Sequence, residues 1–314
     1  MTLDPSAGAS ASTWRNRISI TSSAPAEPRS GSSEFRGWRS LLAGLLCVGL
    51  PALFVLAPIG AFVLYSFWRN EAGQLVRELT LENYAAFFND ATYRSVFAQT
   101  VALCASATLL NVVLGGTIAL FIARRSERVR FALVLAFMLP LFTSYIIKIY
   151  AIRGILGHRG VLNELLMAAG LISQPLTALI FSQTAIFIAL VVLYLPFAVL
   201  PIFLSMDRIP ANLCAASADL GGSELDAIRR IILPLSLPGI ILAAVFTFVM
   251  TFGDFVTPQM VGGVNGFTFG RIVFTQFGVA LNWPLGAALA VILLATTIAA
   301  VGLAALAAHW AARR

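Results

Sequence analysis

The chain has 314 residues, of which 59% are hydrophobic and only 11% charged, and its mean hydropathy is +0.88. A soluble domain of this size does not need so much apolar surface, whereas a membrane protein does, so the composition excludes the soluble classes. The formal net charge of +7 would suggest nucleic acid in a soluble protein, but here the arginines follow the connections between apolar runs, which excludes nucleic acid as a partner.

Residues 1–38 are rich in Ser, Ala, Thr and Pro and lack apolar periodicity, which predicts a disordered tail. Residues 39–314 contain apolar runs of at least ~20 residues, long enough to cross a ~30 Å hydrocarbon core as helices. The predicted spans are 41–68, 96–122, 131–156, 178–205, 239–261 and 285–308. We therefore expect an all-α, polytopic membrane domain with six transmembrane helices.

The connections between these runs carry weaker signals. A surface helix is expected at Leu81–Phe88 within the polar segment 69–95, and 123–130 is predicted to be a short basic loop. Segments 157–177 and 262–284 contain glycine and are predicted to be loops. The third span contains Pro140, and Pro196 and Pro201 inside the fourth span predict kinks there.

Basic residues are distributed unequally between the two sides of this topology. The side with the tail, 123–130, 206–238 and the C-terminus holds 14 Arg and Lys residues, whereas the opposite connections hold six. Cytoplasmic segments of membrane proteins carry the excess of positive charge. We therefore expect both termini and the segment 206–238 to be cytoplasmic.

Residues 211–240 form a polar island between the fourth and fifth spans. Helix formers at 211–220 precede Gly221, which suits a left-handed C-terminal cap. Ser223 and Asp226 have the spacing of a capping box, which predicts a second short helix ended by Pro234 and Pro238. The expected order is helix, glycine turn, helix and proline-bounded turn at the membrane surface. A passive connecting loop is the alternative.

The island also resembles a known motif. Ala215-Ala216-Ser217-Ala218-Asp219-Leu220-Gly221, nine residues and then Ile231-Ile232-Leu233-Pro234 resemble the EAA loop of bacterial ABC-importer permeases. That motif has Glu where this chain has Ala215, and Ala where it has Ser217. Asp219 is the acid that remains in the first helix. The departure removes a carboxylate that could meet a basic residue of a partner.

Chemical signatures of catalysis are missing from the sequence. Lys148 is the only lysine and follows Ile147, so a phosphate-binding G-x-x-x-x-G-K-[ST] loop is impossible. The two histidines, His158 and His309, fall on opposite sides of the membrane, and the three cysteines show no metal or disulfide spacing. We expect no catalytic residue, no metal and no cofactor on this chain.

Two ionisable residues fall inside predicted spans, Lys148 in the third and Asp254 in the fifth. On straight helices both would lie roughly 23–26 Å from the cytoplasmic side. Charges in lipid are costly and usually face protein or water. Two interpretations stay open at this point. The residues form a salt bridge or snorkel separately, or Asp254 lines a cavity and helps to select a cationic solute.

A second resemblance covers about residues 40–310. Phe252-Gly253-Asp254-Phe255-Val256-Thr257-Pro258-Gln259, Asn282-Trp283-Pro284 and Leu139-Pro140 are similar to the spermidine/putrescine type of permease. The resemblance implies the MetI-like fold and an inner-membrane subunit working with cytoplasmic ABC ATPases that bind ATP and Mg²⁺, a periplasmic solute-binding protein and a second permease, most often a different chain. It implies a small polar solute, foremost putrescine or spermidine, with other small organic solutes as the alternative.

The same resemblance assigns roles to residues. The predicted ATPase-coupling residues are Asn212, Ala215, Ala216, Ser217, Asp219, Leu220, Gly221, Gly222, Leu233 and Pro234. The predicted translocation-pathway residues are Lys148, Tyr150, Phe252, Asp254, Phe255 and Gln259. A secondary transporter and a membrane enzyme are the competing classes. The first lacks an evident inverted repeat, and the second lacks a catalytic cluster.

Overall fold

The computed structural model of the protein describes residues 44–71, 73–264 and 266–313. The predicted tail 1–38 and the first residues of the predicted first span lie outside the described residues. The chain divides into two compact units, with the boundary between Ala57 and Pro58 inside the first apolar helix. That helix consists of a π-helical turn, η1 (Leu45–Gly49), continued by α2 (Leu50–Tyr65).

Five helical segments in the described part of the chain are long and apolar enough to cross a membrane. They are η1–α2, α4 (Ala91–Ala123), α8 (Gln183–Met206), the continuous helix from Glu224 that includes α11 (Leu233–Phe252), and α14 (Trp283–Ala312). A sixth span is formed if a strongly bent helix pair is counted as one crossing. The predicted all-α, six-span fold class is thus confirmed.

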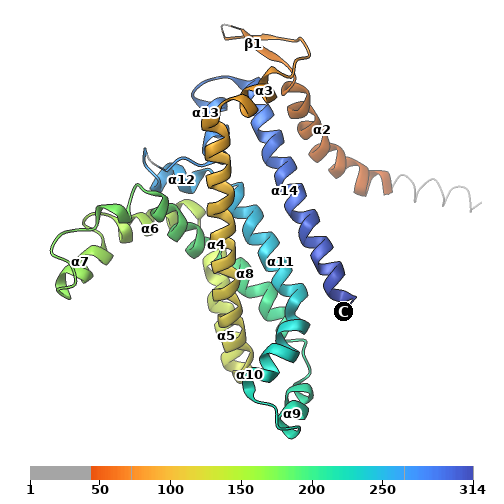
Figure 1. Ribbon diagram of the computed structural model, residues 1–314, viewed down its shortest axis with the longest axis vertical. Helices are drawn as coiled ribbons and strands as arrows, with labels where there is room; N and C mark the ends of the chain where they lie inside the picture. Colours follow the sequence, from red (N-terminus) through yellow and green to blue (C-terminus); the bar gives the residue numbers. More distant parts are fainter. Residues whose placement is uncertain (1–43, 72, 265, 314) are drawn as a thin grey trace, which may run out of the picture. The chain divides into compact units, whose positions relative to one another are not determined.

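Helices α4, α8 and α11 pack together as the centre of the second unit (Figure 1). One face of α4 is buried along its length, and several of its buried residues are small, among them Ala107, Gly115 and Ala119. A Cβ on Gly115 would lie 2.9 Å from the Cβ of Ala198 on α8, so any larger residue would force the two backbones apart. Small residues at such crossings let transmembrane helices approach closely, which suits a bilayer where packing drives association.

The third predicted span, 131–156, is not one continuous helix, and that prediction was wrong. Helix α5 (Glu127–Met138) and a 3₁₀ turn, η2 (Leu139–Phe142), are followed by α6 (Tyr145–Leu156) and α7 (Val161–Ala168) at an angle of 99°. Pro140 lacks the N–H that a continuing helix needs. Its carbonyl oxygen accepts a hydrogen bond from the Thr143 hydroxyl at 2.8 Å. The expected distance of Lys148 from the cytoplasmic side was calculated for a straight helix, so it does not apply to this bent segment.

The polar island enters the fifth span without a turn, so the proline-bounded stop was also wrong. Helix α10 (Glu224–Ala227) passes through a π-helical turn, η4 (Ile228–Ile232), directly into α11. The N–H of Leu233 bonds to the carbonyl of Ile228, one residue further back than in an α-helix. This wider turn precedes Pro234, whose ring would otherwise press on a carbonyl of the preceding turn.

The fifth span itself ends earlier than predicted. Helix α11 stops at Phe252, and α12 (Val256–Val261) begins after a three-residue break centred on Asp254. The predicted end at Val261 was therefore wrong. The cause lies in the side chain of Asp254, which caps the new helix as described below.

The connections contain more structure than the sequence suggested. Helix α3 (Glu82–Asn89) matches the predicted surface helix, but α13 (Phe269–Gly278) and α7 occupy segments predicted to be loops. The basic connection 123–130 is shorter than predicted because α5 already begins at Glu127, an acid that favours a helix N-terminus. Both prolines predicted to kink the fourth span lie inside the unbroken α8.

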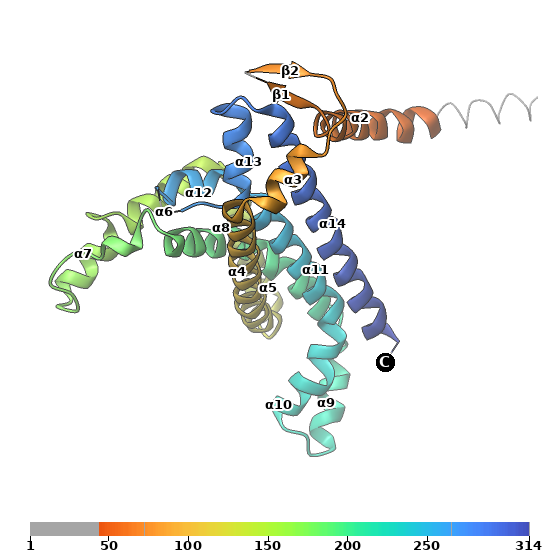
Figure 2. The ribbon, with the colours of Figure 1, turned by 45° about the horizontal axis from the view of Figure 1, so that its top comes forward.

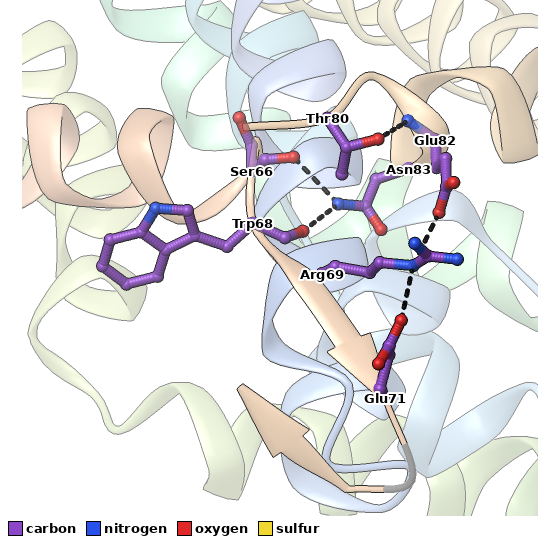
Figure 3. A network of polar contacts seen from close by, with 7 residues as sticks. All are labelled: Ser66, Trp68, Arg69, Glu71, Thr80, Glu82 and Asn83. Atoms are coloured by element: carbon purple, nitrogen blue, oxygen red, sulfur yellow. Dashed lines mark hydrogen bonds and ion pairs between the residues drawn. The ribbon is translucent and has the colours of Figure 1, made fainter. Parts of the chain in front are cut away.

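The segment after α2 is fixed by polar contacts (Figure 3). Strands β1 (Arg69–Glu71) and β2 (Gln74–Val76) form an antiparallel hairpin. The side-chain amide of Asn83 donates to the carbonyls of Ser66 at 2.9 Å and Trp68 at 2.7 Å. Arg69 pairs with Glu71 at 3.2 Å and with Glu82 at 3.1 Å. These contacts join α3 to the hairpin.

The second unit has two distinct ends (Figures 1 and 2). The β-hairpin lies at one end, and α9 (Ala211–Asp219) with α10 lies at the other. Helices α6 and α7 extend sideways from the packed helices in both views. The two candidate sites are the α9–α10 end and the break between α11 and α12.

Candidate functional sites at the α9–α10 hairpin and at Asp254

The α9–α10 hairpin, residues 211–227, is shaped by a glycine cap. Gly221 has φ +80°, and the N–H of Gly222 donates to the carbonyl of Ser217 at 2.8 Å while that of Gly221 donates to Ala218 at 2.9 Å. This pair of bonds is a Schellman motif, which satisfies the last carbonyls of α9. The predicted positive φ at Gly221 is confirmed. A side chain there would be strained because L-residues rarely adopt this conformation.

The second helix of the hairpin begins with the predicted capping box. The Ser223 hydroxyl accepts from the N–H of Asp226 at 3.2 Å, and the Asp226 carboxylate accepts from the Ser223 N–H at 3.1 Å. The Ser223 hydroxyl also donates to this carboxylate at 2.5 Å. These hydrogen bonds from Ser223, helped by nearby Arg230, lower the pKa of Asp226 below its ordinary value.

Two ion pairs fasten the base of the hairpin to neighbouring helices. Arg124 at the end of α4 pairs with Glu224 at the start of α10. Arg130 on α5 pairs with Asp207 at the end of α8 at 2.7 Å. Sequence reasoning missed both pairs and used the arginines only for orientation. No local pattern could have found them, because the partners are about 80 to 100 residues apart along the chain.

The outer surface of the hairpin is exposed. Helix α9 has no buried residue, and the Leu220 side chain at its end is 89% exposed. A shallow groove beside it runs between α9 and α10 and is lined by Leu213, Ser217 and Ile231. Among the predicted coupling residues, Ser217 and Gly222 are half-buried, and Leu233 and Pro234 are exposed at the start of α11. The others lie on the open surface of the hairpin: Asn212, Ala215, Ala216, Asp219, Leu220 and Gly221. Such a surface is available to another protein.

The second site is the Asp254 cluster, which consists of Asp254, Tyr145, Tyr194 and Thr257. Asp254 is only 8% exposed. Its Oδ1 accepts from the backbone N–H groups of Val256 and Thr257, each at 3.0 Å. Its Oδ2 accepts from the hydroxyls of Tyr145 and Tyr194, the latter at 3.2 Å. The carboxylate therefore caps α12 and ties it to α6 and α8.

This arrangement excludes a salt bridge between Lys148 and Asp254, one of the interpretations that the sequence left open. Among the described residues no carboxylate lies within ion-pair distance of Lys148, and both oxygens of Asp254 are taken by hydroxyl and amide donors. The Lys148 ammonium lies 5.9 Å from the centre of the Tyr145 ring instead. The two residues do not pair because the bend at Thr143 turns α6, and Lys148 with it, away from the straight path that was assumed.

The remaining pathway candidates lie in different surroundings. Phe252 is fully buried in an aromatic cluster with Phe97 and Phe248. Phe255 stacks on an aromatic ring of α13 at 4.7 Å between ring centres. Tyr150 and Gln259 are exposed on α6 and α12. Of the predicted pathway residues, only Asp254 and Lys148 share a contacting side chain, Tyr145.

Curated relatives decide the family. The spermidine/putrescine transport system permease protein PotB of Salmonella typhimurium is 33% identical over 247 residues, which cover 78% of this chain and 85% of the relative. The chain belongs to the permeases of ABC importers. PotB of Escherichia coli is 34% identical over 78% of this permease and 89% of the relative. The inner membrane ABC transporter permease protein YdcU of Escherichia coli is 35% identical over 67% of this permease and 70% of the relative.

The fold of this permease agrees with a solved structure. A chain in the crystal structure of a bacterial alginate ABC transporter, in complex with an alginate pentasaccharide-bound periplasmic protein, superposes with a TM-score of 0.72. The alignment covers 87% of this permease and 94% of that chain, at 16% identity, so it concerns the fold alone. No family model matches the chain. The permease is a multi-pass inner-membrane protein whose class works as a transport subunit.

Proposed function

We propose that this permease forms part of the pathway for a polyamine, spermidine or putrescine, in an importer driven by separate ATPase subunits. The relatives named as spermidine/putrescine permeases support this solute. The observation that carries it is the buried Asp254, whose four hydrogen-bond donors are all neutral. A carboxylate in a low-dielectric region lowers the cost of bringing a cation nearby.

The pathway is proposed to run past the break between α11 and α12. Asp254 supplies the negative charge, and the exposed Gln259 and Tyr150 supply hydrogen-bond partners for amines. Phe255 lies next to Asp254 and offers an aromatic face to a cation. Phe252 is enclosed in the described arrangement, so it would reach the pathway only in another packing of the helices.

Coupling to ATP is proposed to begin at the exposed α9 helix. The helix would dock on a cytoplasmic ATPase, which holds ATP and Mg²⁺. Because α10 continues through η4 into α11, a movement of the hairpin is carried along one helix as far as Gly253. The ion pairs of Arg124 and Arg130 link the same movement to α4, α5 and α8. Hydrolysis on the ATPase would thus repack the break beside Asp254.

The orientation proposed from the arginine distribution places both termini and 206–238 in the cytoplasm, with the β-hairpin end facing a periplasmic solute-binding protein. A cysteine at Ser223 tests it after Cys47, Cys104 and Cys214 have been replaced. In intact cells this cysteine should resist a membrane-impermeant thiol reagent and should react once the membrane is opened. Reaction in intact cells would reverse the topology.

Reconstitution tests the solute. The permease, purified with its co-expressed ATPase, second permease and binding protein, should show ATPase activity stimulated by spermidine or putrescine, and proteoliposomes should accumulate the labelled polyamine. Asp254→Asn should lower polyamine uptake at least tenfold, whereas Asp90→Asn, at the exposed cap of α4, should not. Stimulation only by a neutral or anionic solute would refute the polyamine assignment while leaving the importer assignment intact.

A further inference from the structure

The bent span leaves an apolar groove with one charge in its wall. We name it the Lys148 groove, and it is lined by Phe137 of α5, Pro140 of η2, Lys148 and Ile155 of α6, and Val192 and Pro196 of α8. Its volume is about 430 Å³. The groove lies between the two arms of the 99° bend and is closed on its inner side by α8. Its size suits a few side chains rather than a whole helix.

Lys148 needs an anion that the described part of the chain does not supply. Its side chain is half-buried, and its ammonium group lies 5.9 Å from the centre of the Tyr145 ring. Asp254 is already bonded through both oxygens. Ionisable side chains within membrane segments pair with an opposite charge or face water, because an unpaired charge in lipid is costly. The counter-charge must therefore come from outside the described residues.

The solute proposed above does not fit this groove. A polyamine is a polycation, and Lys148 would repel it at short range. The neighbouring face of α6 is instead suited to protein contact, because Ile146, Ile147 and Ile155 are between 47% and 65% exposed. A helix lying across this face could insert side chains into the groove, as ridges pack into grooves between helices.

We propose that a transmembrane helix of a different subunit packs on the Lys148 groove and places a carboxylate against Lys148. Under the proposed function, on which this identification rests, that subunit is the second permease. A second copy of this chain is a poor source of the acid, because α2, α4, α6, α8, α11 and α14 contain no Asp or Glu and Asp254 is already bonded through both oxygens. The groove thus favours a partner of different sequence, and Lys148 contributes to the association of the two subunits.

Photocrosslinking in native membranes identifies the occupant. A benzoyl-phenylalanine residue at Val192, which is 54% exposed in the groove wall, should capture another membrane protein on irradiation. Mass spectrometry of the adduct should find a transmembrane peptide with an Asp or Glu. Capture of lipid alone, or of a second copy of this permease, overturns the proposal. Capture of an acidic helix from a protein outside any ABC importer keeps it and refutes the proposed function instead.

Charge variants of the full complex then test the ion pair. With a tag on this chain, Lys148→Glu should lower recovery of the captured subunit at least tenfold, and Lys148→Arg should recover it near the wild-type level. Arg153→Gln is the matched control, because Arg153 lies on the same helix over the Phe181 ring and outside the groove. Replacing the partner's acid by lysine should restore recovery in the Lys148→Glu background. Unchanged recovery in Lys148→Glu overturns the proposal.

Discussion

Asp254 and Asp226 both lie at the start of a helix, shortly after a glycine, yet they are held in different ways. Asp226 is bonded by Ser223, three residues away, and is otherwise near only Arg230 on the next turn. Asp254 is buried and is bonded by two local N–H groups and by hydroxyls from α6 and α8. At the membrane surface water completes the solvation of a carboxylate, whereas within the bilayer the protein must supply every donor.

The two aspartates also differ in how much of the structure they stabilise. The Asp226 box organises one turn of the hairpin, and its loss leaves groups that water can reach. The Asp254 cluster joins three helices, and its loss leaves two hydroxyls and two amides without their acceptor in a dry interior. An aspartate thus caps a single helix at Asp226, whereas at Asp254 it connects three helices. Substitutions at the two sites should differ accordingly.

The largest effect is expected from Asp254→Ala. Removing the carboxylate leaves buried donors unpaired and should lower the free energy of unfolding by about 3–4 kcal/mol. Denaturant titration in detergent micelles measures it. The matched control is Asp90→Ala, which removes an exposed N-cap at the start of α4 and should cost about 1 kcal/mol. Equal losses from the two substitutions would show that the Asp254 cluster is no more than a local cap.

A double substitution distinguishes the cluster from an ion pair. Asp254 is bonded by neutral donors, and Lys148 lies over the ring of Tyr145, one of those donors. Asp254→Asn and Lys148→Met can therefore be coupled through Tyr145 but should not compensate each other, so the double variant should be no more stable than either single variant. The measurement is a double-mutant cycle of unfolding free energies. Recovery of stability in the double variant would instead indicate a salt bridge between the two residues.

Sequence reasoning succeeded where the determining residues are neighbours in the chain. The positive φ of Gly221, the Ser223–Asp226 box and the surface helix at 82–89 are set by residues within a few positions of one another. The apolar length of each run was enough for the fold class. The prolines were harder to interpret, because one ends a helix near Pro140 and another is accommodated at Pro234 by a π-helical turn.

The features that sequence reasoning missed depend on residues far apart in the chain. Tyr145 and Tyr194 reach Asp254 across 109 and 60 positions, and no spacing rule links them. The bend of the third span then removed the expected Lys148 partner. A buried carboxylate in an apolar run was itself the available signal, since it must find donors somewhere. The sequence could state that requirement but not name the groups that meet it.

A smaller stability effect with a large functional effect is expected from Gly221→Val at the hairpin. The substituted residue must hold φ near +80°, which costs roughly 1–2 kcal/mol. The strain should shift the end of α9, so ATPase binding or coupling of hydrolysis to uptake should be lost. Gly221→Asn is the control, because asparagine tolerates the left-handed conformation. Normal uptake and ATPase binding by Gly221→Val would exclude the hairpin as the coupling element.

The smallest effect is expected from Ser223→Ala, and it should depend on pH. Loss of the cap should cost about 1 kcal/mol at pH 7. The pKa of Asp226 is lowered in the folded protein, so the stabilisation by its ionised form is complete above the unfolded-state value of about 3.9 and is lost as the pH falls through the folded-state pKa. The stability difference between wild type and Ser223→Ala should therefore shrink below about pH 4, as followed by thermal unfolding between pH 3 and pH 7. Asp226→Asn should remove this pH-dependent part, because it cannot ionise. If the difference instead grew on acidification, the protonated form of Asp226 would be the stabilising one. The capping box would then not depend on an ionised carboxylate.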